Sequence, residues 1–152
     1  MTPTTLIVGL GSPYGDDKIG WVACEQLKMD IGHLSTVDFV TCDRSGLEWL
    51  TKMSDAGQVL FVDAMRSGEK PGTVRKIDLS ADQWSEYPAK LSSHGINIMD
   101  AIDLAQSLGE LPETISVWGV EIEHCNVEGG LSDSVKTALP TLLANIKSEI
   151  LQ

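Results

Sequence analysis

The sequence has few cysteines and few basic residues, and each shortage excludes a class of protein. Its three cysteines, Cys24, Cys42 and Cys125, are widely spaced and form no C-x-x-C pair, so neither a disulfide framework nor a cysteine zinc cluster is expected. Only 11 lysines and arginines stand against 22 acidic residues, which gives a net charge of -11. Because binding to a phosphate backbone needs clustered cations, we expect no nucleic-acid partner.

Long hydrophobic runs are also missing. No uninterrupted apolar stretch approaches the roughly 18 residues of a membrane helix, and residues 1–5 lack the basic start and apolar core of a signal peptide. We therefore expect a cytoplasmic protein without a membrane partner. The 152 residues, 42% of them hydrophobic, suit a single domain over residues 1–152 that buries its core without disulfide or metal support.

Apolar strand-like segments alternate with amphipathic helix-like segments along the chain. Strands are expected near residues 5–9, 37–42, 59–62 and 114–120, with a more exposed strand at 73–78. Helices are expected from Asp16 or Asp17, over 46–54, from residue 97, and from about residue 132, where Pro140 should kink or restart the last one. This order predicts an α/β fold: one three-layer domain with a mostly parallel, twisted sheet of about five strands and helices on both faces.

The acidic pair Asp16-Asp17 stands between the first strand and the first helix. In an open parallel sheet, the carboxyl end of a strand and the start of the next helix face the crevice where ligands bind. Two adjacent carboxylates would oppose a phosphate and would favour a metal ion or a proton transfer. A dinucleotide fingerprint is not supported either, because Tyr14 stands where G-x-G-x-x-G requires its third glycine.

Three side chains form a candidate metal site: Asp17, Asp63 and His94. Asp63 follows the apolar strand at residues 59–62, and His94 precedes the helix expected from residue 97, so all three could reach one crevice. Two carboxylates and an imidazole can hold a divalent transition metal with open positions, and nickel, zinc and manganese all fit this ligand set. A carboxylate after a buried strand is costly unless it meets water, hydrogen bonds or a cation, which favours a site role for Asp63.

Structural roles for the same residues remain open beside the metal site. Either aspartate of the pair could cap the first helix, where a carboxylate contributes typically about 1 kcal/mol. His94, taken alone, fits a capping or core-edge histidine.

These residues resemble those of the hydrogenase maturation endopeptidases, which trim the carboxy-terminal extension from the large-subunit precursor of nickel-iron hydrogenases. The resemblance covers nearly the whole chain. It is carried by Leu-Ile-Val-Gly-Leu-Gly at 6–11, Gly-Asp-Asp-Lys-Ile-Gly at 15–20, Val-Asp-Ala at 62–64, Pro-Gly at 71–72, Ser-His at 93–94 and Val-Trp-Gly-Val at 117–120. It implies a phosphorylase/hydrolase-like fold and a metal site at Asp17, Asp63 and His94. Within the acidic pair, we therefore assign the metal to Asp17 and the capping or supporting role to Asp16.

By this resemblance, the three side chains would recognise nickel already inserted into the precursor, so the metal is carried by the substrate and no organic cofactor is expected. A bound nickel could also polarise the scissile carbonyl or lower the pKa of a water molecule. The water-activating group therefore stays unidentified, with Asp17 and Asp63 as candidates that act through the metal.

The chain also departs from the family pattern. Ser12 and Lys18 replace a usual asparagine and a frequent glycine, the loop at residues 43–46 reads Asp-Arg-Ser-Gly, and Ile122 replaces a common proline. These departures indicate a divergent subgroup and leave substrate choice open.

Two other classes of function remain. A peptidyl-tRNA hydrolase begins with a similar strand and turn, but its substrate needs a basic face and its histidine is absent near residue 20 here. A non-cleaving module that senses metal, or acts as a chaperone, would dock on a precursor without cutting it.

Overall fold

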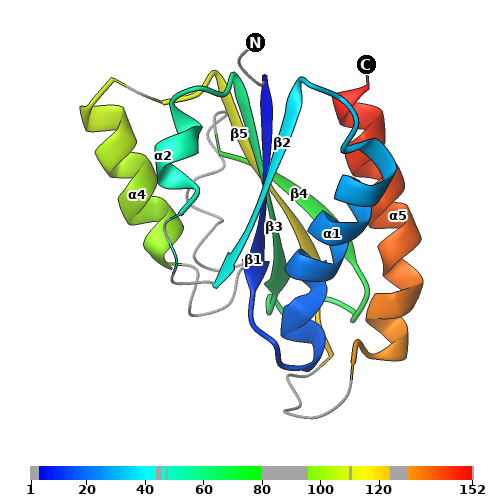
Figure 1. Cartoon of the computed structure of the whole chain (residues 1–152). Helices are drawn as coiled ribbons and strands as arrows, with labels where there is room; N and C mark the ends of the chain where they lie inside the picture. Colours follow the sequence, from blue (N-terminus) through cyan, green and yellow to red (C-terminus); the bar gives the residue numbers. More distant parts are fainter. Residues whose placement is uncertain are drawn as a thin grey trace.

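The computed structural model describes residues 4–43, 46, 48–79, 96–109, 111–123 and 130–151. A twisted five-stranded sheet lies between two layers of helices (Figure 1). The strands are β1 (Thr5–Gly11), β2 (Val37–Asp43), β3 (Gln58–Met65), β4 (Val74–Asp78) and β5 (Thr114–Glu121). One face is covered by α1 (Ile19–Ile31) and α5 (Asp133–Ile150), and the other by α2 (Leu50–Met53) and α4 (Ile96–Ser107).

The strand order is β2-β1-β3-β5-β4, and four of these strands are parallel. Parallel neighbours require crossover connections, and helices of both layers supply them. The carboxyl ends of β1, β2, β3 and β5 therefore lie at one end of the sheet, the lower end in Figure 1. Strand β4 runs antiparallel, at the edge beside β5. The α/β fold and the more exposed strand expected from the sequence are thus confirmed.

The central strands supply side chains to two separate cores. In β3, Val59 and Phe61 pack in the core beneath α2 and α4, whereas Leu60 and Val62 pack in the core beneath α1 and α5. Because helices cover both faces of the sheet, the sequences of β1 and β3 are continuous apolar runs and do not alternate between apolar and polar residues. Strand alternation directs Asp63 to the same side as Phe61, toward the layer of α2 and α4.

Three elements differ from the sequence-based expectation. Helix α2 is shorter than the expected 46–54. Strand β3 does not end before Asp63, because its parallel pairing with β5 continues to Met65 opposite Glu121. Helix α5 continues through Pro140 as one element. Proline has no backbone N–H, so the helix lacks one hydrogen bond at this position. Burial of an uninterrupted apolar stripe offsets this loss, and the stripe consists of Val135, Ala138, Leu142, Leu143 and Ile146.

The two described cysteines are buried thiols, in agreement with the expectation from their spacing. Cys24 on α1 and Cys42 on β2 are both free. Burial is the main cause that raises the pKa of each thiol to about 12, so each stays protonated at neutral pH. Cys125 lies outside the described residues. Among the helices that the structure describes, none is both long and apolar enough to cross a membrane.

Candidate functional site

Close backbone contact holds the start of α1 against the ends of β1 and β3. A Cβ atom on Gly20 would lie 2.1 Å from the carbonyl oxygen of Leu10 and 2.5 Å from that of Val62. A Cβ atom on Gly11 would lie 2.4 Å from the carbonyl oxygen of Asp17. Backbones approach this closely only where the side chain is absent. The glycines of the first motif therefore serve helix-on-sheet packing, which brings Asp17 to the carboxyl end of the sheet.

Asp17 lies in η1 (Gly15–Lys18), a short 3-10 turn that joins β1 to α1 and contacts β3. Its side chain is 9% exposed. The Ser12 hydroxyl donates a hydrogen bond to Asp17 Oδ2 at 2.5 Å, and the Asp17 N–H donates to the carbonyl of Tyr14 at 3.1 Å. Within the described part of the chain, no side-chain hydrogen bond from an N-cap residue closes η1 or α1. The carboxylate is therefore held by the turn before it and does not cap the first helix.

Asp63 is a fully buried carboxylate near the carboxyl end of β3. Its Oδ1 accepts a hydrogen bond from the N–H of Ala64 at 2.8 Å, and its backbone lies in register with Gly119 of β5. The residue before it, Val62, is the one whose carbonyl touches Gly20. Asp63 and the start of α1 thus lie at the same end of the sheet, where the sequence predicted that Asp17 and Asp63 would meet.

His94, the third predicted metal ligand, lies outside the described residues. The described chain resumes at Ile96, the first residue of α4, and this end of α4 lies toward the carboxyl ends of the parallel strands (Figure 1). Within the described ranges, no group of three or more histidine, cysteine, aspartate or glutamate residues could hold a metal ion. The complete three-residue site therefore stays a prediction.

Asp16 is fully buried and joins three distant parts of the chain. Its Oδ1 accepts a hydrogen bond from the N–H of Ser132 at 2.6 Å, and its Oδ2 accepts from the Ser132 hydroxyl at 2.8 Å and from the N–H of Glu123 at 3.0 Å. Ser132 is the N-cap residue of α5, and Glu123 follows β5. Asp16 therefore holds the turn that carries Asp17 through a tertiary contact, and not through capping of its own helix.

Glu121 is a further buried carboxylate at this end of the sheet, and sequence reasoning gave it no role. It is 4% exposed and accepts hydrogen bonds from Ser67, from the N–H at 3.0 and 3.1 Å and from the hydroxyl at 2.5 Å. These bonds fasten the turn after β3 to the end of β5. The available signal was a charged residue directly after an apolar strand, the same signal that singled out Asp63.

Comparison with known proteins agrees with this architecture. The chain matches the family described as HycI, hydrogenase maturation protease, over residues 23–149. A putative hydrogenase maturation protease of Methanocaldococcus jannaschii is 27% identical over 150 residues, which cover 95% of each chain. The hydrogenase expression/formation protein HupD of Thiocapsa roseopersicina is 24% identical over 136 residues. That match covers 88% of this chain and 62% of HupD, so this chain spans less than two thirds of that relative.

A solved structure has the same fold. The hydrogenase maturating endopeptidase HybD of Escherichia coli superposes with a TM-score of 0.83 at 22% identity, over 96% of this chain and 91% of that one. This likeness confirms the fold class. The family match covers most of the chain and confirms the resemblance found in the sequence. The chain belongs to the hydrogenase maturation protease family.

Proposed function

We propose that this protein is an endopeptidase that removes the carboxy-terminal extension of a nickel-iron hydrogenase large-subunit precursor after nickel has been inserted. Membership of the maturation protease family supports the peptidase activity. Recognition of nickel in the precursor is supported by one observation, the arrangement of Asp17 and Asp63. These are two buried carboxylates at the same end of the sheet. Carboxylate oxygens and a histidine nitrogen suit a divalent metal, and His94 is the proposed third ligand.

The two aspartates are oriented before any substrate arrives. The Ser12 hydroxyl fixes Asp17 through Oδ2, and the N–H of Ala64 fixes Asp63 through Oδ1. Ligands that are already ordered lose less conformational freedom on binding, which favours association with a metal presented by another protein. In this proposal nickel is part of the substrate, so only a precursor that has received its metal is held at the site.

Cleavage follows from the same contact. A nickel ion held between the precursor and this site can polarise the scissile carbonyl or lower the pKa of a water nucleophile. Asp17 and Asp63 then act on the reaction through the metal they bind. The proposed place of reaction is the cytoplasm, where buried thiols such as Cys24 and Cys42 persist unpaired.

Incubation of the protein with a candidate precursor, with and without nickel, tests the proposal by mass spectrometry. The expected result is one discrete carboxy-terminal fragment from the nickel-loaded precursor and none from the nickel-free one. A stable complex with the loaded precursor but no fragment would show a non-cleaving binding module instead. Tight, salt-sensitive binding of tRNA without any fragment would support the peptidyl-tRNA hydrolase alternative.

A further inference from the structure

Strand β4 is an edge strand with only one neighbour among the described strands. It pairs antiparallel with β5, with Val74 opposite Val120 and Lys76 opposite Trp118. An edge strand presents a row of backbone N–H and C=O groups that can pair with another extended chain. Which residues of β4 present these groups depends on the hydrogen-bonding pattern of its ladder with β5.

The two ends of the ladder fix this pattern. The N–H of Glu121 donates to the carbonyl of Thr73 at 2.8 Å, and the N–H of Leu79 donates to the carbonyl of Ile115 at 2.8 Å. In an antiparallel pair, residues that exchange hydrogen bonds alternate with residues that do not. Since the residues bonded to β5 carry odd numbers at both ends, the N–H and C=O groups of Val74 and Lys76 point away from β5.

Val74 at the start of this strand, together with the turn at residues 70–73, forms one wall of an open groove beside α5. The groove has a volume of about 710 Å³, and its opposite wall consists of Asp133, Ser134, Thr137, Ala138, Thr141 and Asn145 of α5. The turn before β4 closes one end, since a Cβ atom on Gly72 would lie 2.8 Å from the carbonyl oxygen of Ser134. The α5 wall is thus made mainly of small hydroxyl and amide side chains.

These features identify an extended polypeptide as the occupant. Alternate outward N–H and C=O groups are the pattern that an added strand recognises, and pockets beside the edge receive every second side chain of that strand. The charged groups of the lining, Lys70 and Asp133, have opposite signs, so the groove selects neither charge. The nearby Lys76 ammonium is bound by Glu149 at 2.6 Å and does not add a cationic centre.

The groove begins at the end of the sheet that holds the candidate site. Arg75 of β4 is in register with Gly119 of β5, and Gly119 is in register with Asp63 of β3. With neighbouring strands about 4.8 Å apart, a strand added outside β4 would lie about 14 Å from β3, a distance that about four extended residues span. One chain could therefore occupy both the groove and the site.

We propose that the carboxy-terminal extension of the precursor binds along the edge of β4 as an added strand, paired with the backbone of Val74 and Lys76, and that the groove between the start of β4 and α5 receives its side chains. This inference rests on the proposed function. The bound segment lies about four residues or more from the cleaved bond. Because backbone groups make the contact, the enzyme recognises an extended tail of sufficient length and not a particular tail sequence.

Val74→Pro tests the backbone contact. Proline removes the outward N–H of an edge residue while leaving the ladder with β5 intact, which strands tolerate at their first position. We expect KM for the nickel-loaded precursor to rise about tenfold, with kcat within about twofold, as for the loss of one or two hydrogen bonds. Val74→Ala is the reference, because it shortens the same side chain and keeps the N–H, so the rise in KM of Val74→Pro beyond that of Val74→Ala measures the backbone contact.

Thr141→Trp tests the groove itself, because an indole there would fill the space beside β4. The control is Ala144→Trp, which adds the same indole at an exposed position of α5 that does not line the groove. We expect a raised KM for Thr141→Trp alone, and only with precursors whose extension is longer than about four residues. Unchanged KM in both Val74→Pro and Thr141→Trp would overturn the docking proposal.

Binding measurements separate this proposal from the proposed function. A wild-type protein that binds the precursor without cutting it, and loses affinity in Val74→Pro, would contradict the endopeptidase and support the groove. A wild-type protein that cuts the precursor, with affinity equal in both groove variants and their controls, would support the endopeptidase and contradict the groove.

Discussion

The carboxylate of Asp16 accepts two hydrogen bonds from Ser132, a residue 116 positions later in the chain. The N–H of Ser132 reaches Oδ1 at 2.6 Å and its hydroxyl reaches Oδ2 at 2.8 Å. Because Asp17 is the next residue, this contact ties the candidate nickel ligand to the start of α5. The acidic pair therefore combines a residue that positions the site with a residue that is proposed to bind metal.

Removal of this carboxylate should destabilise the protein. Asp16→Ala deletes the acceptor of two N–H groups and a hydroxyl, and a buried donor left without its acceptor costs about 1–3 kcal/mol. Ser132→Ala removes only the hydroxyl bond and should lower the free energy of unfolding by about 1 kcal/mol. Urea unfolding of both variants measures the difference. A loss in Asp16→Ala no larger than that in Ser132→Ala would show that the backbone contacts contribute little.

Gly20→Ala should displace α1 from the strand ends. The new Cβ would meet the backbone oxygens of Leu10 and Val62, which cannot rotate away as a side chain would. We expect a loss of about 1–3 kcal/mol in the free energy of unfolding, and a lower precursor-cleavage rate per folded molecule because Asp17 moves with the helix. Gly130→Ala is the matched control, since no described atom lies within 4 Å of its Cβ position. Equal stability and cleavage in the two variants would refute the packing argument.

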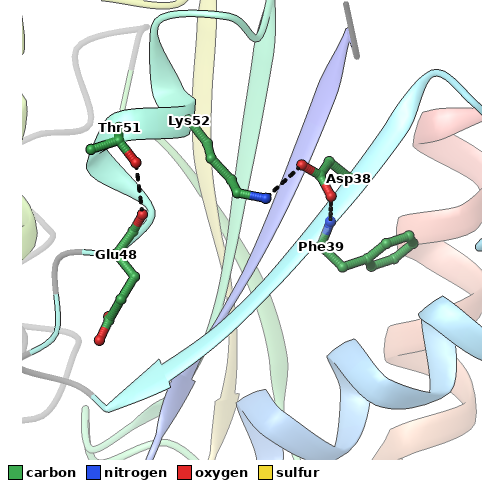
Figure 2. Close-up of polar contacts among 5 residues, drawn as sticks. All are labelled: Asp38, Phe39, Glu48, Thr51 and Lys52. Carbon is green, nitrogen blue, oxygen red and sulfur yellow. Dashed lines mark hydrogen bonds and ion pairs between the residues drawn. The ribbon is translucent and has the colours of Figure 1, made fainter.

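The ion pair between Asp38 and Lys52 should make stability depend on pH. Lys52 Nζ lies 3.0 Å from Asp38 Oδ2, and the N–H of Phe39 donates to Oδ1 at 2.9 Å (Figure 2). Burial is the largest single influence and raises the pKa of Asp38, but the hydrogen bonds from Lys52 and Phe39 and the positive charges of Lys52 and Lys28 together outweigh it and hold this pKa below its ordinary value of 3.8.

A carboxyl group whose pKa is lower in the folded state stabilises the protein above its unfolded-state pKa, and this contribution is lost as pH falls through the folded pKa. Lys52→Met should therefore lower the free energy of unfolding near neutral pH by about 0.2–1 kcal/mol, since both side chains are partly exposed. The loss should shrink at an acidic pH below the folded-state pKa of Asp38. Urea unfolding at both pH values checks this, and an equal loss at both would exclude the ion pair as its cause.

Local patterns were sufficient to predict most of the fold. Helix α1 followed from a periodic apolar stripe, and Ile19, Ala23 and Leu27 of that stripe are indeed buried. Strand β3 was recognisable because helices cover both of its faces. The end of β3 could not be predicted, because its extension past Asp63 depends on a register with β5 that no local pattern encodes.

The candidate site was predictable in position but not in its supporting contacts. Asp17 and Asp63 were singled out because the carboxyl ends of parallel strands share one edge, and the structure places both residues at that edge. The partners of Asp16 and Glu121 could not be found, since Ser132 and Ser67 become neighbours of these carboxylates only after the sheet has formed. Composition and spacing carry no information about such long-range pairs.

The most direct test of the proposed nickel-binding site is the cleavage of nickel-loaded precursor by the variants Asp17→Ala and Asp63→Ala. Asp103→Ala, which removes an exposed carboxylate of α4, serves as the control, and Asp63→Asn keeps the shape of the buried side chain. Circular dichroism would first establish that each variant is folded, and His94→Ala would extend the test to the third predicted ligand. We expect the wild type and Asp103→Ala to release the fragment and the site variants to release none; full release by Asp17→Ala and Asp63→Ala would contradict the proposed role of these aspartates.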